Sequence, residues 1–199
     1  MTGGARHFHQ QKNKNTLSKM KRHILTAALL AVLPLHAAEK SVRGSTAAPQ
    51  PIPNELIDYP RYLQIAREVQ PLREMRRVTE EQFATMAFDP RTVVLDARSA
   101  DKFRMRHIKG AVSLPFTDFT AESLAKVLPE KTTRVLIYCN NNFRSAPISF
   151  ASKSAPASLN ISTYVALATY GYTNVYELGP LLDVKTTRLT FEGGEVGRE

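Results

Sequence analysis

The chain has 199 residues, of which 43% are hydrophobic and 23% are charged. These proportions are ordinary for a folded protein and exclude disorder along the whole chain. The formal net charge is +9, but six of the 27 basic residues and none of the 18 acidic residues lie within residues 1–38. Because a nucleic-acid-binding protein carries its basic surface on the folded domain, the nearly neutral remainder indicates that nucleic acid is not a partner.

Residues 1–38 have the pattern of an export signal. A short basic region begins at Met20, an apolar stretch covers residues 24–35, and the small residues Ala37 and Ala38 follow. The apolar stretch is shorter than the roughly 20 residues that cross a bilayer as a helix. We therefore expect signal cleavage, a periplasmic or secreted protein of bacterial type, and no stable membrane span. An uncleaved N-terminal anchor is the alternative, and the polar residues before Met20 indicate that translation starts there.

Composition divides the rest of the chain into four parts. Residues 39–53 are rich in Ala, Pro, Ser and Thr and predict a linker, and residues 54–77 predict a helical lead-in interrupted by Pro60 and Pro71. The main domain is expected over residues 78–186, followed by a glycine-containing flexible tail over residues 187–199.

The main domain alternates helix and strand signals in chain order. Thr79 and Gln82 have the spacing of a capping box, so a short helix should run to about Phe88. Strands are predicted at 92–95, 111–114, 134–138 and 174–178, and further helices at 120–128 and 160–170. This alternation predicts an α/β fold with a central, mainly parallel sheet. Ligands bind such sheets at the carboxyl ends of the strands.

Cys139 is the only cysteine and comes directly after the strongest predicted strand. A thiol becomes a nucleophile when a nearby cation or a helix N-terminus stabilises its thiolate. Arg144 supplies a cation, and with Ser145 it is expected to begin a helix whose dipole favours an anion. The alternative interpretation is a buried cysteine that merely ends a strand.

Three asparagines follow the cysteine, and they tolerate left-handed backbone better than most residues. They would let the loop curl with its N–H groups facing inward, as an anion-binding nest. These residues are Asn140, Asn141 and Asn142.

Four segments in order resemble the rhodanese-like (sulfurtransferase) family. They are residues 93–98, 103–111, 136–145 and 171–179, and they are similar to the family's D-x-R strand end, its G-H-I-P-G-A turn, its C-x-x-G-x-R-S active loop and a later glycine-bounded strand. The resemblance implies a three-layer domain in which helices flank the sheet.

The resemblance also implies a mechanism. Cys139 would take the outer sulfur of thiosulfate or a similar donor as a persulfide and pass it to a thiol or cyanide-like acceptor. Arg144 would bind the oxyanion end of the donor. The active loop that binds the substrate would comprise Asn140, Asn141, Asn142, Phe143, Arg144 and Ser145. Neither a metal nor an organic cofactor is implied, and no protein partner is identified.

Departures from the family pattern keep a second class open. Asn142 stands where the family usually has glycine, and Phe143 adds an apolar side chain to the loop. These changes permit a catalytically weak module that binds a partner or senses sulfur. A phosphatase or arsenate-reductase interpretation is disfavoured by the length of the loop. In those relatives five residues separate the cysteine from the arginine, whereas four residues separate Cys139 from Arg144. Residues 149–159 predict a surface insertion, with a lid over the active loop as the alternative.

Three polar residues are expected to support the structure rather than the chemistry. Asp96 and Arg98 predict an ion pair. His107 is the only histidine after residue 38, which argues against a histidine relay or a multi-histidine metal site. We expect His107 to fasten its own turn.

Overall fold

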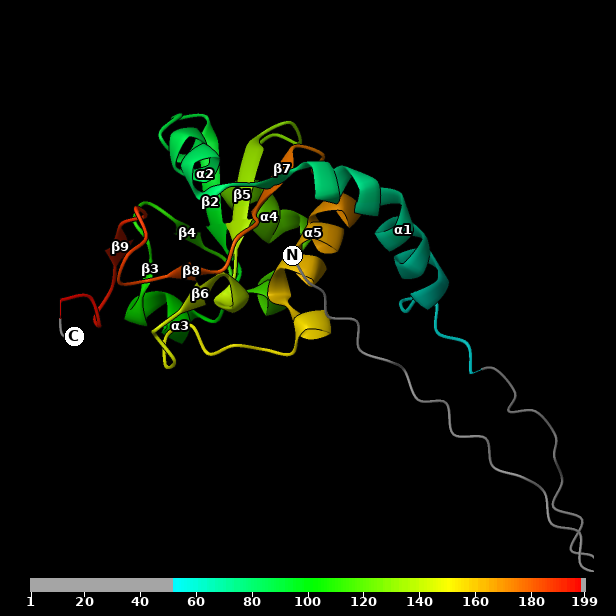
Figure 1. Cartoon of the computed structure of the whole chain (residues 1–199). Helices are drawn as coiled ribbons and strands as arrows, with labels where there is room; N and C mark the ends of the chain where they lie inside the picture. The colour runs from blue at the N-terminus through cyan, green and yellow to red at the C-terminus, as the bar shows by residue number, and fades with distance from the viewer. Residues whose placement is uncertain (1–51, 198–199) are drawn as a thin grey trace, which may run out of the picture. The chain divides into compact units, whose positions relative to one another are not determined.

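A computed structural model of the chain describes residues 52–197, and these residues form a parallel sheet with helices on both faces (Figure 1). The predicted export signal and residues 39–51 of the predicted linker lie outside the described residues. The α-helices are α1 Tyr59–Met75, α2 Glu80–Ala87, α3 Ala100–Met105, α4 Ala121–Val127 and α5 Leu159–Thr169. Short 3-10 helices are η1 Phe116–Asp118, η2 Asn140–Asn142 and η3 Ala155–Ala157. The strands are β1 Arg77–Val78, β2 Thr92–Asp96, β3 His107–Ile108, β4 Val112–Ser113, β5 Arg134–Tyr138, β6 Phe143–Arg144, β7 Val175–Leu178, β8 Leu182–Asp183 and β9 Phe191–Glu192.

The central sheet has five strands in the order β1-β7-β5-β2-β4, and all of its pairings are parallel. The predicted α/β class with a parallel central sheet is therefore confirmed. Strand β5 is the middle strand, and its residues 135–138 are all buried, as expected for a strand covered on both faces. The strand ends directly at Cys139.

Side chains of β5 alternate between two hydrophobic cores, as the period of a strand requires. Leu136 and Tyr138 enter one core, which includes Phe83 of α2. Val135 and Ile137 enter the other. This second core also holds residues of α4 and α5, namely Leu124, Tyr164 and Leu167. The three expected layers are thus α2, the sheet, and α4 with α5.

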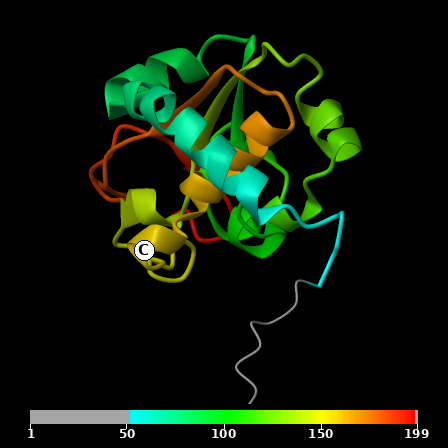
Figure 2. The same ribbon diagram turned by 90° about the vertical axis from the view of Figure 1, so that its right-hand side faces the viewer.

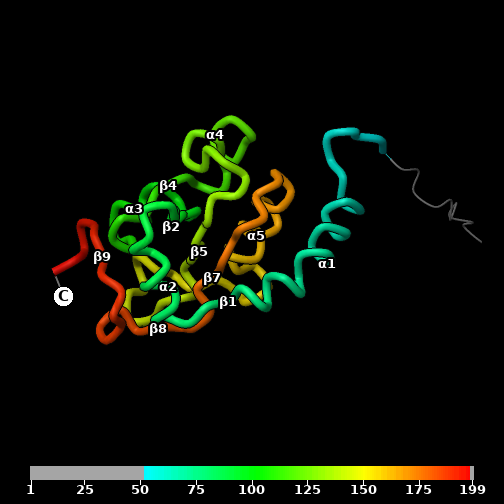
Figure 3. The backbone as a smooth tube through the Cα atoms, turned by 90° about the horizontal axis from the view of Figure 1, so that it is seen from above, coloured from blue at the N-terminus to red at the C-terminus, as the bar shows by residue number. Residues whose placement is uncertain are grey.

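Helix α1 packs along α5 at the edge of the domain, as Figures 2 and 3 show. Asp58 caps its first turn by accepting a hydrogen bond from the Arg61 N–H at 2.8 Å. Pro60 lies in the first turn, where its missing N–H has no helical partner to lose. The lead-in was expected to be interrupted at Pro71, but α1 continues through Pro71 to Met75.

The start of α2 follows the sequence pattern closely. The Gln82 N–H donates to Thr79 Oγ1 at 3.2 Å, and the Thr79 N–H donates back to Gln82 Oε1 at 2.9 Å. This reciprocal capping box satisfies two N–H groups that the first helical turn leaves without partners.

The prediction of a flexible tail over residues 187–199 is wrong for the described part of that segment. Strand β9 pairs antiparallel with β3, so that Ile108 lies opposite Phe191. Beyond β9, the Gly194 N–H donates to the Arg104 carbonyl at 2.9 Å. Gly193 has φ +128°, and a Cβ there would collide with the Met105 carbonyl, so this glycine permits close packing instead of fraying.

The segment before β9 is also anchored. Thr187 Oγ1 and the Arg188 N–H both donate to the Glu80 carboxylate at 2.5 Å. The Thr187 hydroxyl is the largest cause that holds the pKa of Glu80 below its ordinary value. The start of α2 and the C-terminal segment are therefore fixed to each other.

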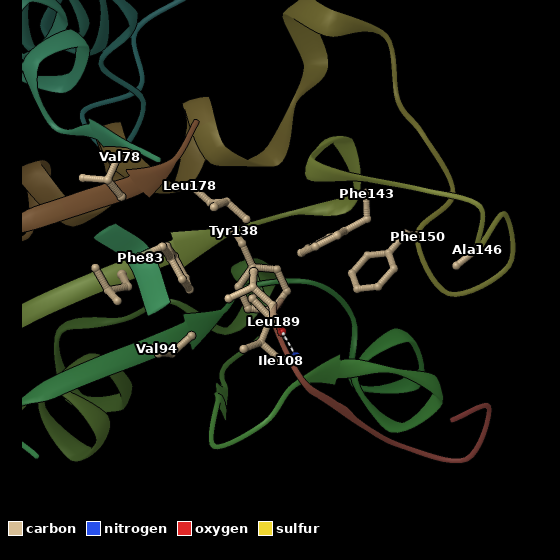
Figure 4. Close-up of a cluster of buried hydrophobic side chains, with 11 residues drawn as sticks. Val78, Phe83, Val94, Ile108, Tyr138, Phe143, Ala146, Phe150, Leu178 and Leu189 are labelled. Carbon is tan, nitrogen blue, oxygen red and sulfur yellow. Dashed lines mark hydrogen bonds between the residues drawn. The ribbon is translucent and has the colours of Figure 1, made fainter. Parts of the chain in front are cut away.

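Aromatic side chains extend the first core toward the C-terminal segment. Figure 4 shows Phe143 and Phe150 side by side in this cluster, with ring centroids 4.5 Å apart. The Phe191 ring packs edge-on against both, at 5.3 Å and 5.9 Å. The C-terminal segment thus completes the core beneath the active loop.

The Phe191→Ala variant tests the role of that segment. We expect a loss of about 2–3 kcal/mol in the free energy of unfolding, because the ring leaves a cavity beside Phe143 and Phe150. Urea denaturation measures this loss. Val196→Ala is the matched control: Val196 is 43% exposed, and its loss should stay within about 0.5 kcal/mol. Equal stabilities of the two variants would show that the segment is not part of the core.

Candidate active site

A buried ion pair lies behind the predicted active loop. Asp96 ends β2, and Arg98 Nη2 lies 2.6 Å from Asp96 Oδ2, with the side chains 0% and 2% exposed. The predicted ion pair is therefore present. Burial opposes the charge on Arg98, but the hydrogen bonds and charge of Asp96 outweigh burial and raise the pKa of Arg98 above its ordinary value. Arg98 also donates to the carbonyls of Ser149 at 2.9 Å and Arg106 at 2.7 Å.

Tyr138 connects this ion pair to the strand that carries the cysteine. Its hydroxyl donates to Asp96 Oδ2 at 2.5 Å and accepts from the Ile108 N–H at 3.1 Å. Burial, followed by the Asp96 charge, raises the pKa of Tyr138 well above its ordinary value, so the phenol stays a neutral donor. The residue before Cys139 is thereby fixed to β2 and β3.

Cys139 itself is 1% exposed. The next three residues form the 3-10 turn η2, in which the Asn142 N–H donates to the Cys139 carbonyl at 3.2 Å. The Cys139 N–H donates to Asn142 Oδ1 at 2.9 Å. The loop therefore closes on the cysteine through the Asn142 side chain.

Asn142 also ties the loop to two other elements. Its Nδ2 donates to the Leu178 carbonyl at 2.7 Å and the Pro180 carbonyl at 3.2 Å, at the end of β7. Its Oδ1 accepts from Asn160 Nδ2 of α5 at 2.9 Å. A glycine at this position offers none of these bonds.

The predicted helix at Arg144 and Ser145 is wrong. Residues 143–144 form β6, which pairs parallel with β8. Ser145 has φ +67° and is the only non-glycine residue with positive φ within residues 52–197, so the asparagines do not take the left-handed backbone expected of them. Phe143 is 0% exposed. Burial of its ring in the core draws the chain into an extended strand where the sequence predicted a helix.

Arg144 points toward Asp183. Its Nε lies 3.4 Å from Asp183 Oδ2, and 66% of its side chain is exposed. Ser145 Oγ donates to the same oxygen at 2.9 Å. The Lys185 N–H is the largest cause of the lowered pKa of Asp183, followed by the Ser145 hydroxyl. Arg144 and Ser145 line a cavity of about 380 Å³ that includes neither Asn142 nor Ser158.

Residues 149–159 lie against the active loop. Asn140 Nδ2 donates to the Ala151 carbonyl at 2.7 Å. Asn141 exchanges two hydrogen bonds with the backbone of Lys153, at 2.8 Å and 3.0 Å. Ser158 Oγ lies 3.4 Å from Cys139 Sγ. These contacts favour the lid alternative over a remote surface insertion. The sequence does not identify Ser158 as a site residue, because a serine in a serine-rich stretch carries no distinguishing pattern.

His107 fastens the turn between α3 and β3. Its Nδ1 lies 2.8 Å from the Phe103 carbonyl, and its ring stacks on the Phe103 ring with centroids 3.7 Å apart. Its Nε2 lies 3.7 Å from a Glu192 carboxylate oxygen. Within residues 52–197 no group of three or more His, Cys, Asp or Glu side chains is arranged to hold a metal ion.

Two cavities adjoin the active loop. One of about 600 Å³ includes Arg98, Lys102 and Asn140 in its lining. The other, of about 300 Å³, is lined by Asn141, Asn142, Ala155, Ser158, Asn160, Ile161, Gly179 and three charged residues, Arg73, Arg77 and Glu177. The sequence pattern of the lead-in gave no sign that Arg73 and Arg77 face this loop.

The fold and the loop agree with a comparison against known families. Residues 79–179 match the family model of the rhodanese-like domain. The chain therefore belongs to the rhodanese-like domain family, as the four sequence segments predicted. Rhodanese-like domains form a sulfurtransferase superfamily, although the domain can be catalytically inactive.

Solved structures with a similar fold include a rhodanese-like domain of the Alr3790 protein from Anabaena (19% identity, 62% of this chain and 83% of that chain covered, TM-score 0.45). A protein from Bacillus halodurans, BH2092, has 16% identity, covers 67% of this chain and 86% of its own, and has a TM-score of 0.43. A rhodanese with anions from E. coli has 19% identity, coverage of 52% and 99%, and a TM-score of 0.34. No protein with a curated description matches this chain.

No helix within residues 52–197 combines the length and hydropathy needed to cross a membrane.

The Asp96→Asn variant tests the ion pair behind the loop. It leaves the buried Arg98 without its counter-charge, so we expect a loss of about 3–5 kcal/mol in the free energy of unfolding, measured by urea denaturation. Asp101→Asn is the control, because Asp101 pairs with Arg104 on the surface and should change stability by less than about 1 kcal/mol. A small effect at Asp96 would contradict a structural role for the pair.

The Asn142→Ala variant tests the loop clamp. It removes the partners of the Cys139 N–H and the Leu178 carbonyl, so we expect a loss of about 2–4 kcal/mol. Thermal denaturation followed by circular dichroism measures the change. Asn141→Ala removes two bonds at the exposed edge of the same loop and should lose less than about 1.5 kcal/mol. If both variants were equally stable, Asn142 would not hold the loop.

Proposed function

We propose that the protein is a sulfurtransferase that carries a sulfane sulfur as a persulfide on Cys139. The observation that carries the proposal is the position of the thiol, at the carboxyl end of the middle strand of a rhodanese-like domain and 3.4 Å from the Ser158 hydroxyl. Ligands of parallel α/β sheets bind at this edge. The Ser158 hydroxyl gives the sulfur a polar neighbour in an otherwise buried position.

The reaction has two half-reactions. The Cys139 thiolate attacks the outer sulfur of thiosulfate, the donor S–S bond breaks, and sulfite leaves with the bonding electron pair. An acceptor thiolate or cyanide then attacks the outer sulfur of the persulfide, and the Cys139 thiolate leaves. No net oxidant or reductant is consumed. Because Cys139 is 1% exposed, the donor reaches it only after the atoms that cover the sulfur move aside.

A rhodanese-like module without turnover is the second candidate. The engagement of Arg144 by Asp183 favours it, because the arginine at the family's anion-binding position is turned to another surface. The same contact gives no support to a phosphatase-like reaction, in which the arginine would bind the phosphate through two donors.

Export completes the proposal. The basic and apolar pattern of residues 1–38 supports a periplasmic or secreted enzyme whose partners are a small sulfur donor and a small acceptor, without nucleic acid. In an oxidising compartment a lone cysteine has no partner in its own chain for a disulfide. Sequencing the N-terminus of the protein recovered from its native host tests this part, and an N-terminus upstream of residue 36 would contradict cleavage.

Intact mass spectrometry tests the chemistry. We expect reduced protein incubated with thiosulfate to gain the mass of one sulfur atom, and to release thiocyanate when cyanide is added. Cys139→Ser should show neither result, since the persulfide has no other site. If the unmodified protein gains no sulfur while remaining folded, the module without turnover is the correct alternative.

A further inference from the structure

The cavity of about 300 Å³ beside the active loop carries an excess of positive charge. Within the described residues its charged lining side chains are Arg73, Arg77 and Glu177. Two guanidinium groups therefore share one carboxylate. The unpaired positive charge favours an anionic ligand.

The two arginines are held differently. Arg73 engages Glu177 through two atoms, with Nη2 to Oε1 at 2.7 Å and Nε to Oε2 at 2.6 Å. Arg77 Nε lies 3.6 Å from Glu177 Oε1, and its Nη2 donates to the Gly179 carbonyl at 3.0 Å. Arg77 is 47% exposed and Arg73 22%. Since a guanidinium has five N–H donors, Arg77 keeps donors for a ligand, whereas Arg73 is paired closely with Glu177.

The cavity and the thiol share a side chain. Ser158 lines the cavity, and its hydroxyl lies 3.4 Å from Cys139 Sγ. Asn142 also lines the cavity and closes the loop on the Cys139 N–H. The cavity that Arg77 lines is therefore also lined by the side chain that contacts the sulfur.

We propose that Arg77, oriented by its hydrogen bond to the Gly179 carbonyl, binds the oxyanion end of a small anionic sulfur donor in this cavity. The inference rests on the proposed function for its chemistry, but the binding site stands on the geometry alone. The inference gives a role in substrate specificity to Arg77, which lies before residues 79–179, the part of the chain that matches the family model. Arg144 is not part of this site, because it lines a different cavity.

Calorimetric titration of thiosulfate into the full-length Cys139→Ser protein measures binding without turnover. Adding Arg77→Gln should weaken binding about tenfold or more, the loss expected for a charge-assisted hydrogen bond. Arg67→Gln is the matched control on α1, since Arg67 is exposed and lines none of the cavities described above. Binding of equal strength in Arg77→Gln and Arg67→Gln, or no binding by the parent, would overturn the inference.

Glu177→Gln supplies a test of opposite sign. It removes the carboxylate that competes for both arginines, so thiosulfate should bind several-fold more tightly in the folded variant. A purely structural role for this cluster predicts weaker binding in both Arg77→Gln and Glu177→Gln, and that result would count against the proposal. Circular dichroism verifies that each variant is folded.

Sulfur transfer measured on protein that retains Cys139 distinguishes the proposed binding site from the proposed function. Arg77→Gln should raise the KM for thiosulfate about tenfold while kcat changes little, as expected when ground-state and transition-state binding are lost equally. If Cys139 gains sulfur and Arg77→Gln has the parental KM, the inference fails and the function stands. If thiosulfate binds as expected but Cys139 never gains sulfur, the function fails and the binding site stands.

Discussion

The position of the reactive loop depends on one buried carboxylate. A carboxylate in the interior needs compensating partners, and Asp96 has one partner two residues along the chain and another in β5. They are the Arg98 guanidinium and the Tyr138 hydroxyl, and Arg98 extends the network to the carbonyls of Arg106 and Ser149. This network fixes the ends of β2 and β5 to the turn before β3 and to Ser149, where residues 149–159 begin. Cys139 follows Tyr138 directly.

A second polar side chain sets the shape of the loop itself. The family usually has glycine at the position of Asn142, and the larger asparagine side chain would be expected to narrow the active-site pocket. In the structure the Asn142 amide binds the Cys139 N–H, the carbonyls of Leu178 and Pro180, and Asn160. These bonds replace backbone freedom with a rigid connection between the loop, β7 and α5. The loop gains order, and the thiol is enclosed more tightly than an open anion cradle would enclose it.

The features that the sequence predicted correctly depend on residues close together in the chain. The capping box at Thr79, the strand at 134–138 and the pair of Asp96 and Arg98 each involve residues no more than four positions apart. The wrong predictions involve distant partners. Strand β9 forms by pairing with β3, which lies more than 80 residues earlier in the chain. Arg144 lies in an extended strand because β6 pairs with β8, where Asp183 is its partner. Periodicity and composition contain no information about such partners, so a glycine-containing segment predicts a flexible tail.

The same long-range pairing explains why the lead-in matters for the proposed chemistry. Sulfur transfer from an oxyanion donor needs a cation near the nucleophile, and pairing of β6 with β8 places Arg144 beside Asp183. Packing of α1 on α5, together with the pairing of β1 with β7, brings Arg73 and Arg77 to the cavity that Ser158 also lines. The residues that would recognise the donor therefore lie outside the matched family segment. On this view the lead-in is part of the catalytic unit, and a fragment limited to residues 79–179 would keep the cysteine but lose the charge that attracts its substrate.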